Sequence, residues 1–182
     1  MPRLLLLRHA KAAAGSLGAA DIDRPLVPPG RRAATLVGEH IARHHLEPDR
    51  VLCSSSRRTR ETLAAILPHL SGDFDVRVSL ALYEPGTGHY LDAIGRFGGA
   101  AQTLLVIGHN PSMQETADVL IGSGSGELRE AAASRFSTSA LAVIDFDQTR
   151  WEEVAPRSGR IVAFFRPRDL EVVGRGDSDD EA

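Results

Sequence analysis

The stretch Leu4-Leu5-Leu6-Leu7-Arg8-His9 decides the fold. Four leucines follow one another without a polar break, and the run ends at an arginine beside a histidine. A continuous apolar run of this kind predicts a strand that is buried on both faces, as in a parallel sheet covered by helices. In such sheets, ligands bind beyond the carboxyl ends of the strands. We therefore expect Arg8 and His9 to lie at a binding edge and to face an anion.

The overall composition excludes several classes of partner. Of the 24 acidic residues, four lie in the last six positions, so the rest of the chain is close to neutral. General nucleic-acid-binding proteins carry a basic face, so we expect no nucleic-acid partner. No apolar run approaches the roughly 20 residues of a membrane span and no signal peptide is recognisable, so we expect no membrane partner. A single cysteine, Cys53, fits a reducing cytoplasm.

The order of the elements predicts one domain over residues 1–170 and an acidic, disordered tail over residues 171–182. Apolar strands alternate with amphipathic helices in the first half, which predicts a three-layer α/β/α fold with a mainly parallel central sheet. The expected strands lie at the N-terminus and at residues 50–53, 74–82, 103–108, 140–146, 151–154 and 160–165. The expected helices begin near residues 28, 57, 87 and 111, and we expect a loop at residues 11–26 and a flexible segment at residues 122–126.

Three of the predicted strands end in polar residues. The first ends at Arg8-His9, the second at three serines followed by Arg57 and Arg58, and the fourth at His109-Asn110. If these strands are parallel, all three ends meet at one edge of the sheet. Cations at the start of a helix are disfavoured by about 0.3–1 kcal/mol each, because the positive end of the helix dipole lies there. A bound anion reverses that sign, so the arginines after the second strand also predict an anion site.

These residues resemble the motifs of the histidine phosphatase superfamily, which has the phosphoglycerate-mutase-like fold. Arg8-His9-Ala10 resembles its Arg-His-Gly motif, Arg58-Thr59-Arg60-Glu61-Thr62 its second motif, and Gly108-His109-Asn110-Pro111 its second-histidine motif. Asp23-Arg24-Pro25-Leu26 is similar to the segment that follows the first motif. The small size, the Gly-His-Asn-Pro sequence and the strand-rich end around Trp151 are most similar to the SixA-like phosphohistidine phosphatase branch, over roughly residues 1–167.

The resemblance implies a role for each matched residue. His9 is implied as the nucleophile that becomes a phosphohistidine, and Arg8, Arg58 and His109 as the pocket for the phosphoryl oxygens. Asn110 belongs to the same phosphate-binding group, and Glu84 is similar to the acid that protonates the leaving group in some branches. No metal and no other cofactor are implied. The chemistry agrees, because a neutral imidazole is a competent nucleophile and two guanidinium groups stabilise a transferring phosphoryl group.

Two departures from the family pattern bear on the substrate. The glycine of the first motif is Ala10, and Gly15 stands where mutases commonly have an asparagine that touches phosphate. This weakens the mutase interpretation and predicts a more open pocket. We therefore favour hydrolysis of a phosphohistidine on a protein. The alternatives are a phosphomonoesterase or mutase acting on a small metabolite, and a non-catalytic regulator that only binds phosphate.

Several of these side chains also have a purely structural interpretation. Glu84 is equally explained as a loop carboxylate, and Arg24 either binds substrate or anchors its loop through Asp23. Asn110 is expected to cap the helix that follows, with Pro111 in its first turn. The remaining predictions place Trp151 and Cys53 in the core and these histidines on the surface: His40, His44, His45, His69 and His89.

Overall fold

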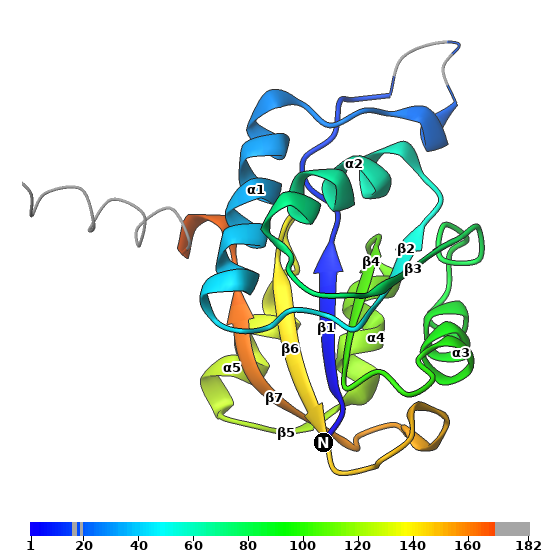
Figure 1. The fold of residues 1–182 in the computed structure, drawn as a ribbon, viewed down its shortest axis with the longest axis vertical. Coiled ribbons are helices and arrows are strands. Elements are labelled where there is room, and N and C mark those ends of the chain that lie inside the picture. Colours follow the sequence, from blue (N-terminus) through cyan, green and yellow to red (C-terminus); the bar gives the residue numbers. More distant parts are fainter. Residues whose placement is uncertain (16–17, 19, 170–182) are drawn as a thin grey trace, which may run out of the picture.

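The computed structural model describes residues 1–15, 18 and 20–169. In this part of the chain, seven strands form one sheet in the order β3-β2-β4-β1-β6-β7-β5 (Figure 1). The strands are β1 (Arg3–Arg8), β2 (Arg50–Ser54), β3 (Asp75–Ser79), β4 (Thr103–Gly108), β5 (Ile121–Ser123), β6 (Leu141–Phe146) and β7 (Gly159–Phe165). The expected acidic tail lies outside the described residues, so the domain boundary at residue 170 stays a prediction.

Helices cover both faces of this sheet. They are α1 (Pro28–Arg43), α2 (Arg57–Ile66), α3 (Thr87–Phe97), α4 (Ser112–Leu120) and α5 (Gly126–Ser134), with short 3-10 helices η1 (Asp21–Asp23), η2 (Leu67–His69) and η3 (Trp151–Glu153). Figure 1 shows α1 and α2 in front of the sheet and α4 behind it. The predicted three-layer α/β/α fold is confirmed.

The leucine run forms the central strand. Leu4 and Leu6 point into a core shared with α3, α4 and α5, whereas Leu5 and Leu7 point into the core beneath α1 and α2. Side chains alternate across a strand, so a strand with helices on both sides must be apolar at every position. All four leucines are fully buried. The uninterrupted run therefore follows directly from the place of β1 between β4 and β6.

The sheet is mainly parallel, as expected. β1 pairs in parallel with β4, and β4 with β2, so the carboxyl ends of these three strands meet at one edge. β6 runs antiparallel to both β1 and β7. The predicted meeting of Arg8-His9, the serines after β2 and His109 at one edge is thus confirmed.

Four parts of the chain differ from the predictions. Where a strand was expected at residues 151–154, Trp151–Glu153 form η3; Trp151 is buried there and its indole N–H donates to the Ala101 carbonyl at 2.8 Å. Residues 122–126 are partly ordered as β5, which pairs with β7. The α5 helix after it was not expected, although Ser125 accepts a hydrogen bond from the Leu128 N–H in the usual manner of a helix cap. The spacing of Leu63, Ile66, Leu67 and Leu70 predicts a helix that continues to residue 70, but α2 ends at Ile66 and Leu67 is 39% exposed.

The prediction of surface histidines is wrong for His40. Its ring is buried, with its centroid 4.0 Å from that of Phe165 at the end of β7. The helix period places His40 on the polar face of α1, but β7 extends far enough to cover that position. His69 is half-buried, whereas His44, His45 and His89 are exposed, as expected. Cys53 and Trp151 are buried, and burial raises the pKa of the Cys53 thiol to about 12.

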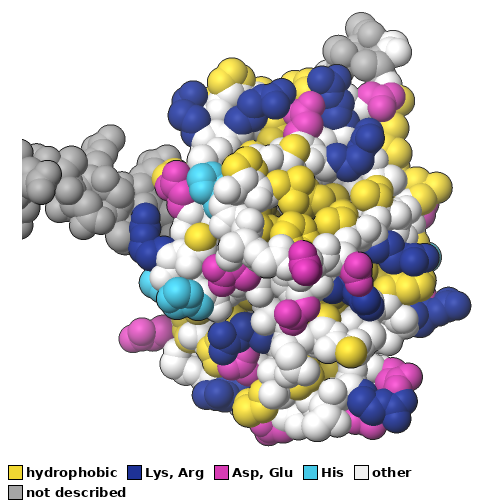
Figure 2. Space-filling model, viewed as in Figure 1, with side chains coloured by type: hydrophobic (Ala, Val, Ile, Leu, Met, Phe, Trp, Pro, Cys, Tyr) yellow, Lys and Arg dark blue, Asp and Glu magenta, His cyan; other side chains and the backbone are white. Residues whose placement is uncertain are grey.

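Charges of both signs share the face that α1 and α2 cover. Where Lys and Arg side chains gather over the upper parts of these helices, acidic side chains lie among them (Figure 2). Glu61, for example, forms ion pairs with Arg31 of α1 and with Arg57 of α2. This mixed face differs from the single-sign surface that general nucleic-acid binding requires.

Candidate active site

The carboxyl edge of β1, β2 and β4 carries a cavity of about 230 Å³. Of the predicted site residues, Arg58, Glu84, His109 and Asn110 line it, together with Asp21 and Tyr83. His9 lies beside this group, with its ring centroid 5.1 Å from that of His109. The structure therefore brings together residues from three strand ends and from the loop that follows β3.

His9 is held at the end of β1 by its own backbone and by the residue after it. Its N–H donates to the Gly108 carbonyl at 3.0 Å, which extends the β1–β4 pairing by one residue. Its Nδ1 lies 2.8 Å from the Ala10 carbonyl oxygen. A carbonyl only accepts hydrogen bonds, so Nδ1 carries the hydrogen and Nε2 keeps its lone pair. The buried imidazole is thus fixed in the tautomer that a nucleophile at Nε2 needs.

The first turn of α2 places Arg58 beside this histidine. Ser56 caps the helix by accepting the Thr59 N–H. One turn later, the Thr62 hydroxyl donates to the Arg58 carbonyl at 2.7 Å and accepts the Ala10 N–H at 3.0 Å. The spacing of four residues between arginine and threonine thereby ties α2 to the residue that follows His9. The Arg58 side chain is buried, so its charge acts with little screening.

His109 is positioned by Tyr90 and Ser54. Its backbone N–H donates to the Tyr90 hydroxyl at 2.9 Å, and that hydroxyl donates to the Leu82 carbonyl at 2.9 Å. A Cβ at Gly108 would lie 2.2 Å from the same hydroxyl, so this contact requires a glycine at the end of β4. On the imidazole, Nε2 lies 2.8 Å from the Ser54 hydroxyl at the end of β2. The ring is therefore oriented from two neighbouring elements.

Arg8 and Asn110 meet on one carbonyl group. The Arg8 Nη1 donates to the Phe136 carbonyl at 2.8 Å, and the Asn110 Nδ2 donates to it at 3.1 Å. The prediction that Asn110 caps α4 is wrong: Pro111 is the capping residue, and α4 begins at Ser112. The Asn110 side chain is unavailable as a cap because it is turned toward the segment between α5 and β6.

Comparison with known proteins identifies the family. The profile described as "Histidine phosphatase superfamily (branch 1)" matches residues 4–93. An uncharacterized protein of Mycobacterium tuberculosis is 37% identical over 164 residues, which is 89% of this chain and all of that protein. Crystallised SixA from Agrobacterium tumefaciens superposes with a TM-score of 0.77 and 32% identity, over 92% of this chain and 99% of that one. The protein histidine phosphatase SixA, solved with tungstate, superposes with a TM-score of 0.71 and 27% identity, over 92% and 99%.

The chain belongs to the histidine phosphatase superfamily. Within it, the similarity is to the SixA-like branch, as the motifs predicted. The phosphoglycerate-mutase-like fold is thereby confirmed. Among the described residues of this histidine phosphatase, no helix is long and apolar enough to cross a membrane.

Sequence reasoning missed Asp21. This residue of η1 forms a two-point contact with Arg58, through its carbonyl at 2.8 Å and its Oδ2 at 3.0 Å. Oδ2 also accepts the Tyr83 hydroxyl at 3.0 Å. Hydrogen bonds from Arg24, Tyr83 and Arg58 lower the pKa of Asp21 to about 2, so a negative charge faces the arginine. The loop over residues 11–26 has no periodic pattern that would have indicated this contact.

Arg24 and Glu84 have different surroundings. Arg24 anchors its loop, but through Asp21 and the Ala13 carbonyl rather than through Asp23 as expected. It does not line the cavity. Glu84 does line the cavity and is exposed, in the loop after β3. A proton donor at this place is close enough to solvent to exchange its proton between turnovers.

Both buried imidazoles of the site are neutral at neutral pH. Burial lowers the pKa of His9 to about 4; the Ala10 carbonyl opposes this shift, and the charges of Arg58 and Arg8 add to it. Burial also lowers the pKa of His109 to about 3, with further contributions from His9 and Arg58. Burial, aided by the charges of Arg58 and Arg8, therefore keeps the His9 lone pair free of protons.

We expect the ring of His9 to stay neutral from pH 7 to about pH 5 and to become protonated only near pH 4. In NMR titrations, the His9 ring signals, assigned with the His9→Asn variant, should change near pH 4. A midpoint at the ordinary value of about 6.5 would contradict this electrostatic description. Because the unfolded chain takes up the proton at the higher pH, the free energy of unfolding should fall as the pH decreases from 7 to 5. His9 alone contributes about 2 kcal/mol to this decrease, so His9→Asn should show a shallower dependence.

Proposed function

We propose that this histidine phosphatase removes the phosphoryl group from a phosphohistidine on a protein, through a phosphohistidine intermediate on His9 and without a metal ion. The observation that carries the proposal is the state of His9. Its Nδ1–H is bound to the Ala10 carbonyl, and its pKa is lowered to about 4. The side chain thus presents a neutral Nε2 at the working pH, which is what attack on phosphorus requires.

The groups around His9 fit the charge of a phosphoryl group. Arg58 and Arg8 supply guanidinium N–H groups, and the Ser54 hydroxyl holds His109 in place. Phosphoryl transfer needs little from a protein beyond positioning and stabilisation of negative charge. In the proposed pocket, the side chains of Arg8, Arg58 and His109 bind the three phosphoryl oxygens. Arg8 and Arg58 each donate hydrogen bonds to backbone carbonyls, which orient their guanidinium groups.

The proposed reaction has two steps. The His9 Nε2 forms a bond to phosphorus while the bond from phosphorus to the substrate imidazole nitrogen breaks, and the leaving nitrogen takes a proton from Glu84 or from water. Water then attacks the phosphorus of phospho-His9 and gives one proton to Glu84 or to solvent, while the bond from phosphorus to the His9 Nε2 breaks and inorganic phosphate leaves. His9 returns to its neutral form, so the cycle is closed.

The choice of a phosphohistidine protein rests on three features. The chain is similar to SixA proteins, one of which is named a protein histidine phosphatase and was solved with tungstate, a tetrahedral oxyanion like phosphate. Gly15 stands where mutases commonly have a phosphate-binding asparagine. An imidazole leaving group also needs less help from an acid than an alkoxide does, which suits the exposed Glu84. The position of Glu84 on the cavity wall is the one observation that favours the alternative, a phosphomonoesterase.

The test compares phosphate release from a phosphohistidine protein with release from a panel of phosphomonoesters. We expect a higher kcat/KM on the phosphohistidine protein. We expect Glu84→Gln to lower ester hydrolysis by roughly 10²-fold or more and phosphohistidine hydrolysis by less than tenfold. Glu127→Gln, an exposed residue in the first turn of α5, is the matched control and should change neither.

The other outcomes separate the alternatives. Efficient ester hydrolysis that depends on Glu84, with no activity on phosphohistidine, would establish the metabolite phosphatase instead. Phosphate binding without turnover of any substrate would establish the non-catalytic regulator.

A further inference from the structure

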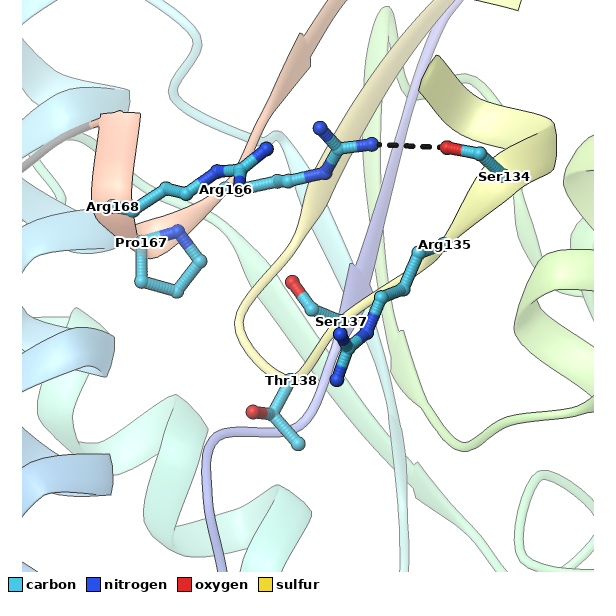
Figure 3. Close-up of a pocket in the computed structure, with 7 residues that line it drawn as sticks. All are labelled: Ser134, Arg135, Ser137, Thr138, Arg166, Pro167 and Arg168. Carbon is cyan, nitrogen blue, oxygen red and sulfur yellow. Dashed lines mark hydrogen bonds between the residues drawn. The ribbon is translucent and has the colours of Figure 1, made fainter. Parts of the chain in front are cut away.

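A second, larger cavity lies beside the proposed phosphate pocket. It has a volume of about 420 Å³ and lies between the end of α5 and the end of β7. Three of the residues that line it are arginines: Arg135, Arg166 and Arg168 (Figure 3). Figure 3 shows the Arg135 side chain running past Ser137 toward Thr138, with Arg166 and Arg168 coming from the other side. We call this cavity the arginine cavity.

The arginine cavity shares a wall with the proposed catalytic site. Arg135, Ser137 and Thr138 line it. Between them, the Phe136 carbonyl accepts the hydrogen bonds of Arg8 and Asn110. Ser139, which directly follows Thr138, donates its N–H toward the carbonyls of Arg8 and His9 at 3.1 and 3.2 Å. One short segment therefore faces the phosphate-binding residues on one side and the arginine cavity on the other.

The charges of the arginine cavity are not balanced locally. Among the residues that the structure describes, Arg135 and Arg166 have no carboxylate within ion-pair distance, whereas Arg168 lies 3.6 Å from Asp169. The Asp169 carboxylate also accepts the backbone N–H of Arg166. Like charges gathered in one hollow repel one another, and the pKa of Arg8, which burial lowers, is lowered further by the charge of Arg135. An anion in this cavity would relieve the repulsion.

Arg166 is fixed in place rather than loosely exposed. Its Nη2 donates to the Ala131 carbonyl at 2.9 Å and to the Ser134 hydroxyl at 3.3 Å, at the last turn of α5. Its Nε is buried without a hydrogen-bond partner among the described residues. Its guanidinium carbon also lies 5.2 Å from the centre of the Phe164 ring. An arginine held in this way loses little conformational entropy when it binds a carboxylate through two hydrogen bonds.

From this arrangement we infer that the arginine cavity is a second subsite, which binds carboxylate side chains close to the phosphohistidine of the substrate protein. The inference rests on the proposed function, because it takes the occupant to be part of the same substrate molecule. Ser137 and Thr138 add hydroxyl groups to the cavity wall, which suit an oxyanion. The subsite would select acidic sequences around the phosphorylated histidine and would contribute to KM rather than to the chemical step.

The test uses the full chain and two synthetic phosphohistidine peptides, one with glutamates flanking the phosphohistidine and one with glutamines. We expect wild type to hydrolyse the glutamate peptide with a KM about tenfold lower at low salt, and the difference to shrink as salt is added. Arg135→Gln and Arg166→Gln should each raise KM for the glutamate peptide several-fold, with kcat within twofold and the glutamine peptide unaffected. Arg135 is exposed, so its variant keeps the test valid if Arg166→Gln unfolds.

Arg160→Gln is the matched control, since it removes an exposed arginine near the opposite end of β7. It should leave the KM of both peptides unchanged. Equal KM values for the two peptides on wild type would overturn the inference, as would an equal effect of Arg160→Gln and Arg135→Gln.

A binding measurement separates failure of this inference from failure of the proposed function. The glutamate peptide with an unphosphorylated histidine is titrated into wild type and into Arg135→Gln, so the readout needs no turnover. Weaker binding to Arg135→Gln supports the subsite even if phosphohistidine is not hydrolysed. Tighter binding of inorganic tripolyphosphate than of the peptide, with the same dependence on Arg135, would overturn the carboxylate assignment in favour of a second phosphate group.

The chain's own C-terminal acids are the remaining competitor for the arginine cavity. A full-length variant with Asp177, Asp179, Asp180 and Glu181 changed to their amides keeps the length and removes the charge. If the KM difference between the two peptides appears only in this variant, the cavity serves the chain's own acids and the inference is overturned. If wild type already shows the difference, the inference stands.

Discussion

His9→Asn is expected to abolish turnover, lowering kcat by roughly 10⁴-fold or more on any phosphorylated substrate. Without the imidazole Nε2, no covalent intermediate forms, so neither step of the proposed reaction can take place. Asparagine preserves a polar amide near the Ala10 carbonyl that now accepts the His9 Nδ1–H. The arginines of the pocket remain, so binding of inorganic phosphate should be largely retained.

The measurement is mass spectrometry of protein mixed with substrate and quenched within one turnover. Wild type should gain the mass of one phosphoryl group, which peptide mapping places on His9, and His9→Asn should gain none. His45→Asn is the matched control, because His45 is exposed and its positive φ of 52° is a conformation that asparagine tolerates. A labelled His9→Asn protein, or one with near-normal kcat, would falsify the assignment of His9 as nucleophile. A thermal melt confirms that the variant is folded.

The sequence predicted the part of the site that lies on strands. The leucine run and the apolar run of β4 specify buried parallel strands, and parallel strands necessarily bring Arg8-His9 and His109 to one edge. Arg58 followed from the cations that crowd the first turn of α2. In each case a local pattern and the geometry of the sheet suffice, because the relevant side chains stand at the ends of regular elements.

The residues that position the site were not predictable in the same way. Asp21 reaches Arg58 from a loop, and the Phe136 carbonyl reaches Arg8 from the segment between α5 and β6. A backbone carbonyl carries no signal in the sequence. The Tyr90 hydroxyl accepts the His109 N–H, and no period or motif in the sequence reveals this contact. These contacts depend on tertiary packing. The same holds for Asn110, whose side chain is turned toward the Phe136 carbonyl instead of capping α4.

Arg58→Ala is expected to lower kcat/KM by roughly 10³-fold, the upper end of the loss of about 10²–10³-fold that removal of one hydrogen-bond donor from an oxyanion site usually causes. Two effects add in this variant. The guanidinium that binds the phosphoryl oxygens is lost, and the Asp21 carboxylate then faces the pocket with Arg24 as its remaining arginine partner. This negative charge, balanced by one arginine fewer, repels the substrate phosphate.

Steady-state kinetics of four variants separates the two effects. Arg58→Lys keeps the charge but not the two parallel N–H groups, so its loss should be intermediate. Asp21→Asn combined with Arg58→Ala should be more active than Arg58→Ala alone, because the repelling charge is gone. The single Asp21→Asn variant completes the double-mutant cycle and measures the coupling between the two residues.

Arg60→Ala is the matched control for Arg58→Ala. Arg60 lies two positions further along α2 and is exposed, so its removal changes the net charge equally and should leave kcat/KM within about twofold. Arg58→Ala also affects His9, because the Arg58 charge helps to lower the pKa of His9. The midpoint of the His9 titration should therefore move upward in Arg58→Ala. If Arg58→Ala stays within tenfold of wild type while Arg60→Ala shows a similar loss, the anion is bound by the exposed face of α2 and the buried pocket is not the site of phosphoryl transfer.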